Sequence, residues 1–472
     1  MRGRLFPSLR ALGASLGASL VVLGAAAPAI AGPDSEVTSS FDVGHGFGLH
    51  ASFGYLFQYH SAGISREHVV PGAQPGDATA LERDLTYSSM RHSIVPRLEL
   101  GLFHDVWVAV ALPVVITDSR SLEFDQRNTP CTFGPDAPCV NRSNSSTIAD
   151  GILPSNGFDA RDPMVGFTDP ANPLIFRGPD RKGLDQLDLG VGWAPLNQRR
   201  DDTKPTWKVG VDLRIAVGKV AKLDRLDPSR ETGVGSGVHE LRLWTTVAKK
   251  RGWAEPYVDM WWQAPICMTS ASAFHDPGFG ARRTDKQQEA GLHFGFEAIA
   301  VDHPADHERF SLDFSGRLVG HFEGRQYSEM WEVFAFAGDA GGTGPLILDA
   351  DPTVTGMQAL SHPGVSNVEN YIEAGGQFAA RAEIGPRVHI AALGAFSGET
   401  QHIISFADAG TDLPTCKDGQ TSACETDRNE VVNPGTTEVS PLHVPLIDLV
   451  GHRYRALGGL DVQVGAELQI LF

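Results

Sequence analysis

The sequence predicts an all-β protein, a transmembrane antiparallel β-barrel of about twelve strands with long loops at one end and short turns at the other. Three observations support this prediction. Apolar and polar residues alternate along many segments, the connections between these segments alternate between long and short, and the chain ends on a strand whose last residue is aromatic. A soluble sandwich or propeller also alternates its faces, but it has no reason to sort its loops by length.

The alternation has a period of two residues, which is the side-chain period of a β-strand. In "LDVQVGAELQILF", residues 460–472, every second residue from Leu460 to Phe472 is apolar, and polar residues or glycine lie between them. In "TWKVGVDLRIAVG", residues 206–218, Lys208, Asp212 and Arg214 alternate with apolar residues. A charge at every second position excludes a dry protein core on that face, so the apolar face is expected to meet lipid.

About a dozen segments share this pattern and have the length that tilted membrane strands need. They are expected at 45–60, 86–103, 105–117, 184–196, 206–218, 238–248, 254–264, 287–301, 309–323, 368–384, 388–403 and 454–472. Long polar stretches are expected at 61–85, 118–183, 219–237, 265–286, 324–367 and 404–453, with only short turns at the other connections. An amino terminus in the periplasm would place the long loops outside the cell.

The first 31 residues predict a secretory signal peptide. Arg2, Arg4 and Arg10 precede an apolar run rich in Ala and Gly, and Ala29-Ile30-Ala31 fits the cleavage rule. The mature barrel is then residues 32–472; a retained anchor helix is the alternative. The net charge of −18 becomes −21 when the three arginines leave, which argues against nucleic acid as a partner.

Four of the five cysteines form two closely spaced pairs within long loops. Cys131 lies near Cys139, and Cys416 lies near Cys424. In an oxidising compartment such pairs predict local disulfides, with Cys267 left as a free thiol. A zinc site built on either pair is the alternative, but no further cysteine or histidine at metal-binding spacing lies beside them.

The last strand resembles the carboxy-terminal signature of bacterial outer-membrane proteins. Phe472 is preceded at every second position by Ile470, Leu468, Ala466 and Val464. The resemblance implies that the bacterial outer membrane is the location and that the barrel-insertion machinery is a partner which recognises the strand ending at Phe472.

A second resemblance covers about residues 90–265. "VPRLELGLFHDVWVAVALPVV" looks like a hairpin of the outer-membrane family named after the MetA pathway of phenol degradation, and "KGLDQLDLGVGWAPLN" resembles that family's Gly-Leu-Gly-Asp strand. Asp185 stands where that family usually has Gly, and Asp188 is displaced. The resemblance implies a barrel of about twelve strands associated with passage of small, often organic, compounds.

The chain offers no motif that predicts an enzyme. H-E-x-x-H and P-loop patterns are absent from the sequence, although a catalytic set assembled from separate strands is not excluded by sequence. His303 with His307, and Asp349 with Asp351, have spacings that metal sites use, but solvated turns account for them better. No catalytic residue, cofactor or metal is therefore expected.

The face opposite the apolar one carries the candidate functional residues, because it would line the barrel lumen. Twelve acids and seven bases fall on it, an excess that predicts a preference for cations or neutral solutes. An ion-paired network that merely fills the barrel is the alternative. The main lumen-facing candidates are Glu99, Asp188, Lys208, Asp212, Arg214, Glu240, Arg242, Asp259, Glu297, Asp313, Arg317, Glu373, Arg381, Glu383, Asp461 and Glu467.

These observations together predict an outer-membrane channel or transporter for passive passage of small solutes, organic ones included. Its partners are the lipid bilayer, the insertion machinery and the solute; the sequence does not determine the oligomeric state. A structural or ligand-binding barrel that acts through its outer loops is the first alternative. A lipid-active outer-membrane enzyme is the second.

Overall fold

The computed structural model describes residues 36–39, 48–70, 79–126, 139–275, 278, 285–303, 305–342, 344–351, 354–410, 432 and 438–472. The predicted signal peptide, residues 1–31, lies outside these residues, and so do Cys131, Cys416 and Cys424. Signal cleavage and both disulfides therefore stay predictions. Cys139 is buried, and Cys267 is an exposed free cysteine as expected.

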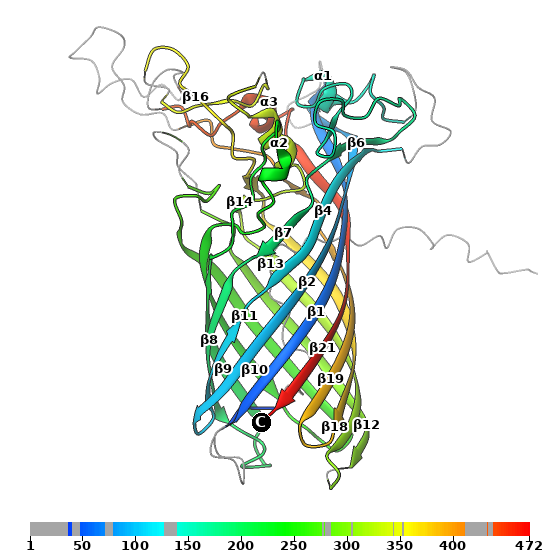
Figure 1. The fold of residues 1–472 in the computed structure, drawn as a ribbon, viewed down its shortest axis with the longest axis vertical. Coiled ribbons are helices and arrows are strands. Elements are labelled where there is room, and N and C mark those ends of the chain that lie inside the picture. The colour runs from blue at the N-terminus through cyan, green and yellow to red at the C-terminus, as the bar shows by residue number, and fades with distance from the viewer. Residues whose placement is uncertain are drawn as a thin grey trace, which may run out of the picture.

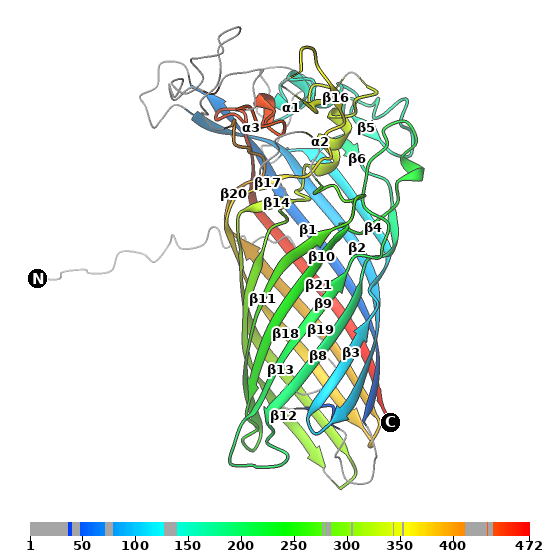
Figure 2. The ribbon, with the colours of Figure 1, turned by 90° about the vertical axis from the view of Figure 1, so that its left-hand side faces the viewer.

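The described residues form a closed antiparallel barrel of twelve strands (Figures 1 and 2). Two of the twelve are each assembled from two consecutive pieces, β3 with β4 and β7 with β8, because β4 pairs with β7 and β3 pairs with β8. The wall runs in the order β1 (Leu49–Val69), β2 (Thr79–Phe103), β3 (Val106–Ala111) with β4 (Val114–Phe124), β7 (Arg181–Leu184) with β8 (Leu187–Leu196), β9 (Thr206–Ile215), β10 (Val238–Ala248), β11 (Ala254–Met268), β12 (Glu289–His303), β13 (Glu308–His321), β18 (Tyr371–Ile384), β19 (Val388–Glu399) and β21 (Tyr454–Leu471).

Strand β21 closes the barrel by pairing with β1 on one side and β19 on the other. Its pairing with β1 runs from His50 opposite Leu471 up to Arg66 opposite Tyr454. The backbone N–H of Phe472 donates to the carbonyl of Leu49 at 2.9 Å, so the ladder continues to the last residue. A closed barrel has no edge strand, so the backbone groups of β21 are paired on both sides.

The outer face of the wall is apolar. Leu460, Val464 and Leu468 of β21 are 38–51% exposed, while Asp461 and Glu467 between them are nearly buried. Phe314 lies between Phe296 and Phe378 on three neighbouring strands, with ring centroids 5.7 and 5.2 Å away. Rows of apolar side chains exposed in this way match the lipid-facing surface of a membrane barrel.

All twelve predicted strands are present, but three of them are much longer than expected. One is β3 with β4, which runs to Phe124, into the polar loop that is predicted over 118–183. The other two are β1 and β2. The sequence predicts a polar loop over 61–85, whereas β1 continues to Val69 and β2 begins at Thr79. From Ala62 to Glu67 every residue of β1 is buried, so the period of two that marks a strand is lost there. This part of the hairpin extends beyond the regularly alternating wall and is covered by the long loops.

The long loops fold into a layer over one end of the barrel, here called the long-loop end; the opposite end is the short-turn end (Figure 1). The smaller elements of the loops are α1 (Ser146–Ala149), β5 (Phe158–Asp159), β6 (Leu174–Arg177), the 3-10 helix Pro228–Arg230, β14 (Gly324–Gln326), α2 (Trp331–Ala337), β15 (Leu348–Asp349), β16 (Ala359–Leu360), β17 (Ser366–Val368), β20 (His402–Ile403) and α3 (Pro445–Asp448).

These loops share one hydrophobic core with the upper parts of β1, β2, β4 and β21. Ile64 and Leu85 of the wall, Phe158 and Ile447 of the loops, and Phe334 of α2 all belong to it and are at most 1% exposed. Burial of each such side chain contributes about 1.5–3 kcal/mol. The core therefore holds the loops on the barrel as a packed cap.

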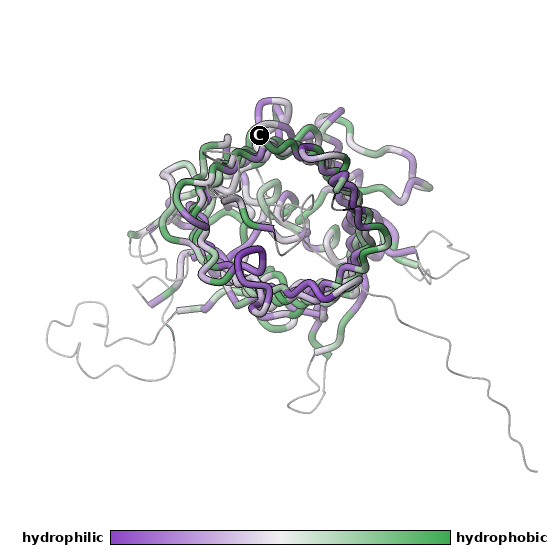
Figure 3. Tube along the Cα trace, turned by 90° about the horizontal axis from the view of Figure 1, so that it is seen from below, coloured by the Kyte–Doolittle hydropathy of each residue, from purple (hydrophilic) through white to green (hydrophobic). Residues whose placement is uncertain are grey.

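Helix α2 lies at the mouth of the barrel and is buried along its whole length. Arg181 of β7 binds Glu332 of α2 through Nε at 2.9 Å and Nη2 at 2.6 Å, and its guanidinium lies over the Trp331 ring at 4.7 Å. Seen along the barrel axis from the short-turn end, loop segments cross the interior of the ring of strands (Figure 3). The mouth at the long-loop end is thus filled by the protein itself.

None of the helices among the described residues is long and apolar enough to cross a membrane.

Candidate solute site in the barrel lumen

A cavity of about 280 Å³ lies inside the barrel. Strands from β2 round to β21 contribute to its wall, together with the amino-terminal segment 36–39. Tryptophans, charged side chains and small residues are prominent among its lining residues. They include Trp107, Trp244 and Trp261, Arg97, Glu99, Asp188, Lys208, Asp212, Arg214, Arg242, Asp259 and Arg317, and Ala109, Ala111 and Gly190.

Each of the three tryptophans lies against a glycine of the neighbouring strand. Trp244 is directly opposite Gly210 in the ladder between β10 and β9, and a Cβ at Gly210 would come within 2.2 Å of its ring. Trp107 is related to Gly192 in the same way, and Trp261 to Gly291. The glycines leave room for the rings to lie flat along the inner wall, which keeps the lumen open at this level.

Several charged lining residues are held by ion pairs or by contact with an aromatic ring. Arg97 donates to Oε1 of Glu99 from Nε at 2.8 Å and from Nη2 at 2.6 Å. Arg214 lies 3.3 Å from Glu240 and 3.7 Å from Asp188. Arg242 lies over the Trp261 ring, 4.6 Å from its centroid, a cation–π geometry. These contacts fix the side chains against the wall and leave the centre of the lumen to a ligand.

The amino-terminal segment 36–39 lies inside the barrel and forms one side of the cavity. Val37 packs against Trp107 and Ala194, and Thr38 donates a hydrogen bond to Glu99 Oε2 at 2.8 Å. The amine of Lys208 donates to the carbonyl of Glu36 at 3.3 Å. This segment narrows the lumen, and no sequence pattern pointed to that position.

The structure places eight of the sixteen predicted lumen residues on the cavity wall: Glu99, Asp188, Lys208, Asp212, Arg214, Arg242, Asp259 and Arg317. Four others belong to buried polar contacts away from the cavity, in which Arg381 bridges Glu297 and Asp313 at 3.2 Å each and Glu383 lies 3.9 Å from Arg309. Glu373 binds Arg317 at 3.3 Å, and Glu240 binds Lys286 at 2.6 Å. Asp461 and Glu467 are buried on β21.

The cavity wall carries balanced charge, although the whole inner face carries an excess of acids. Its acids are Glu36, Glu99, Asp188, Asp212 and Asp259, and its permanent bases are Arg97, Lys208, Arg214, Arg242 and Arg317. The excess acids lie in buried contacts elsewhere. A solute in the cavity therefore meets both signs of charge at similar density.

The inward tryptophans were not predicted from the sequence. Trp193, Trp207 and Trp253, by contrast, are 39–68% exposed. One feature of the sequence could have indicated the inward tryptophans. Gly210 lies on the same, lumen-facing side of its strand as Lys208 and Asp212, and a glycine on that side leaves room for a large ring on the neighbouring strand. Register between strands, however, is not readable from one sequence.

A closed barrel with an apolar outer face and a polar, ion-paired lumen defines the class of this protein, an outer-membrane-type β-barrel. No family model matches the chain, so the expected phenol-degradation family is not confirmed. No curated protein matches it either.

Solved structures with the same kind of fold span almost the whole chain. An outer-membrane channel from Pseudomonas putida F1 is 9% identical and covers 89% of this chain and 95% of its own, with a TM-score of 0.37. A FadL homologue from Pseudomonas aeruginosa is 8% identical and covers 90% of each chain, with a TM-score of 0.30. The outer-membrane protease OmpT from Escherichia coli is 8% identical over 90% of this chain and 96% of its own, with a TM-score of 0.26.

Proposed function

We propose that this protein is a channel of the bacterial outer membrane that lets small organic solutes pass by diffusion, with a preference for neutral or zwitterionic solutes that carry a flat apolar group. The observation that carries the proposal is the lumen cavity, in which three tryptophans lie beside a balanced set of charges. Aromatic faces favour stacking with flat groups, and paired charges of both signs suit a polar solute without net charge.

Passage through the barrel requires movement at the long-loop end, because α2 and the loops around it fill the mouth. The segment 36–39 narrows the lumen in the same way at the cavity. The path through the barrel is therefore gated. The cavity selects the solute, and the cap must move before the solute can pass.

The test is solute entry into proteoliposomes that contain the purified barrel, measured by osmotic swelling. L-phenylalanine, an aromatic zwitterion, is expected to enter faster than a hexose of similar size. Replacing Trp244 and Trp261 by Ala is expected to lower that preference roughly 2- to 10-fold, because an aromatic contact contributes about 0.5–1.5 kcal/mol.

Trp253→Ala is the matched control, since Trp253 is 68% exposed at a short turn, away from the cavity. This variant is expected to leave the preference for L-phenylalanine unchanged.

The channel proposal would be overturned if neither solute entered the proteoliposomes, both with wild type and with a variant that lacks the loop residues 327–342. That result would favour the ligand-binding barrel. The packed loop core is the observation in favour of that second function, because it gives the outer loops a defined surface.

A further inference from the structure

We propose that Glu329, Glu399 and His402 form a binding site for a divalent transition-metal ion of the zinc type, which fastens the cap to the barrel wall. One ligand atom from each of the three side chains lies within 4.8 Å of the other two. Glu329 lies in the segment between β14 and α2, Glu399 ends β19, and His402 lies in β20. The site goes beyond the proposed channel function and does not depend on it.

The site brings two carboxylates together in a largely buried place. Glu329 is 6% exposed and His402 is 2% exposed, while Glu399 is half-buried. Like charges at this distance repel each other, and the repulsion grows as water is removed. A bound cation reverses this balance, because each carboxylate then meets a charge of opposite sign.

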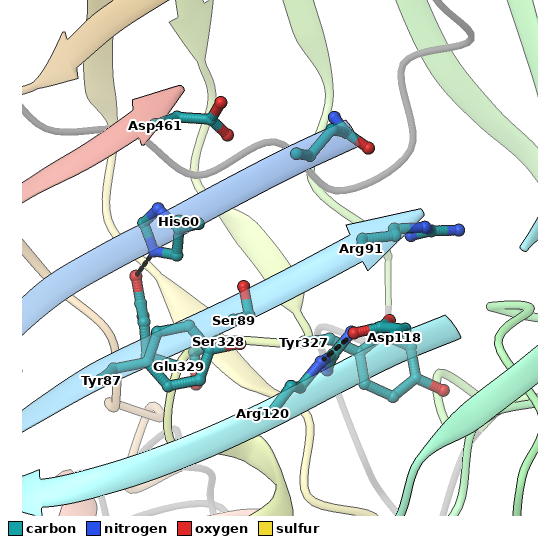
Figure 4. A pocket seen from close by; sticks show the side chains of 11 residues that line it. His60, Tyr87, Ser89, Arg91, Asp118, Arg120, Tyr327, Ser328, Glu329 and Asp461 are labelled. Carbon is teal, nitrogen blue, oxygen red and sulfur yellow. Dashed lines mark hydrogen bonds and ion pairs between the residues drawn. The ribbon is translucent and has the colours of Figure 1, made fainter. Parts of the chain in front are cut away.

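His60 of β1 provides a second, independent observation. It is 6% exposed, and its Nε2 lies 3.8 Å from Glu329 Oε1, too far for a hydrogen bond. Figure 4 shows the two side chains facing each other from the wall and from the cap. Neither ring nitrogen of His60 nor Oε1 of Glu329 has a hydrogen-bond partner, which is unfavourable for buried polar atoms. A metal ion bound by both side chains supplies the missing partner.

His402 is already oriented as metal-binding histidines are. Its Nδ1 donates a hydrogen bond to the carbonyl of Thr400 at 2.9 Å, which leaves the lone pair of Nε2 for a metal. The ring stacks on Tyr371 with a centroid distance of 3.9 Å and an interplanar angle of 10°. A backbone carbonyl on the far nitrogen fixes the tautomer and the ring direction in known metal sites.

The donor set indicates which metal fits. Imidazole and carboxylate together suit zinc and its neighbours, whereas calcium and magnesium take oxygen ligands alone. Zinc bonds of about 2.0–2.2 Å place tetrahedral ligand atoms roughly 3.3–3.6 Å apart. The three ligand atoms lie within 4.8 Å of one another, and His60 Nε2, 3.8 Å from Glu329 Oε1, is the candidate fourth ligand.

The experiment measures zinc bound to the full-length barrel in detergent after equilibration with Zn²⁺ and removal of free ion. Wild type is expected to keep one zinc per chain. His402→Ala and Glu329→Gln are expected to weaken binding by roughly 100-fold or more, because loss of a ligand exceeds the 10- to 100-fold effect of outer-shell changes. His303→Ala is the matched control, since its side chain is 62% exposed on a short turn, and it is expected to keep the ion.

Hydrogen exchange provides a second readout on the same samples. Zinc is expected to slow amide exchange in residues 329–337 of wild type and of His303→Ala, but not of His402→Ala or Glu329→Gln. Glu329 lies in a loop, so Glu329→Gln is expected to fold. This variant therefore still tests zinc binding if His402→Ala fails to fold. Wild type without bound zinc, or variants of the site that retain it, would overturn the proposal.

Discussion

Around Asp212 one face of the barrel wall meets the polar lumen and the other meets lipid. Around Ile64 both faces of the wall are packed against other parts of the protein. Lys208, Asp212 and Arg214 face a polar lumen, and Val211 and Leu213 between them are 36–45% exposed on the outer side. Ile64 and its neighbours in β1 are buried on both faces under the cap. The first region follows a period of two because lipid and water dictate it; the second follows packing, which has no fixed period.

The largest difference in stability is expected between an ion pair in the cap and an ion pair at the short-turn end of the barrel. Glu332→Gln leaves the 1% exposed Arg181 without its carboxylate, and breaking a buried pair costs about 3 kcal/mol or more. Asp302→Asn removes an ion pair with Lys250 in which both side chains are 33% exposed, and such pairs contribute about 0–1 kcal/mol. The measurement is the opening free energy of each region from native-state hydrogen exchange. Equal losses would mean that the cap is no better packed than the turns.

A pH-dependent effect is expected in the cap. Burial raises the pKa of Asp448 in α3 to about 7, even though its Oδ2 accepts a hydrogen bond from the Val444 N–H, which lowers the pKa. The folded pKa lies above the unfolded one, so the cap loses stability as the pH rises from about 4 to about 7.

Asp448→Asn is therefore expected to match wild type near pH 4 and to hold the cap more firmly at pH 8, by about 2–4 kcal/mol. Amide exchange of residues 444–449 at the two pH values is the measurement. If the cap of the wild type were more stable at pH 8 than at pH 4, the raised pKa of the buried Asp448 carboxyl would be contradicted.

The inner and outer faces of the wall are compared by two glycine substitutions. Gly210→Ala places a Cβ 2.2 Å from the Trp244 ring, so overpacking is expected to cost about 1–3 kcal/mol and to shift the tryptophan fluorescence. Gly394→Ala meets nothing within 4 Å on β19 and is expected to change stability by less than about 0.5 kcal/mol. Urea unfolding of both variants checks the difference. Equal effects would show that Trp244 does not lie over Gly210.

The smallest effect concerns charge selectivity. The excess of acids on the whole inner face predicts a preference for cations, but the cavity wall carries five acids and five permanent bases. Fixed charges act mainly within the Debye length of about 8 Å at physiological salt, so the cavity is expected to dominate and the preference to be weak. The reversal potential of the conducting barrel in a salt gradient gives the answer. A strong cation preference would show that the buried acids outside the cavity control the path.

The sequence alone determined the barrel, its twelve strands and the sorting of its connections. In each case the cause is local, because lipid on one side and polar groups on the other force neighbouring residues to alternate, as in 460–472. The same reasoning placed Lys208, Asp212 and Arg214 on the polar face, on which the structure finds the cavity. The extension of β1 to Val69 was missed because both of its faces are buried there and the alternation disappears.

Only the tertiary structure decided which inner residues meet. Trp244 lies over Gly210 because of strand register, and Val37 reaches Trp107 because the amino-terminal segment turns into the lumen. Glu329, Glu399 and His402 come from three segments that a cap brings to one point. A period of two records which face a side chain occupies, but the partner across the barrel depends on register, curvature and loop packing, all of which join residues far apart in the chain.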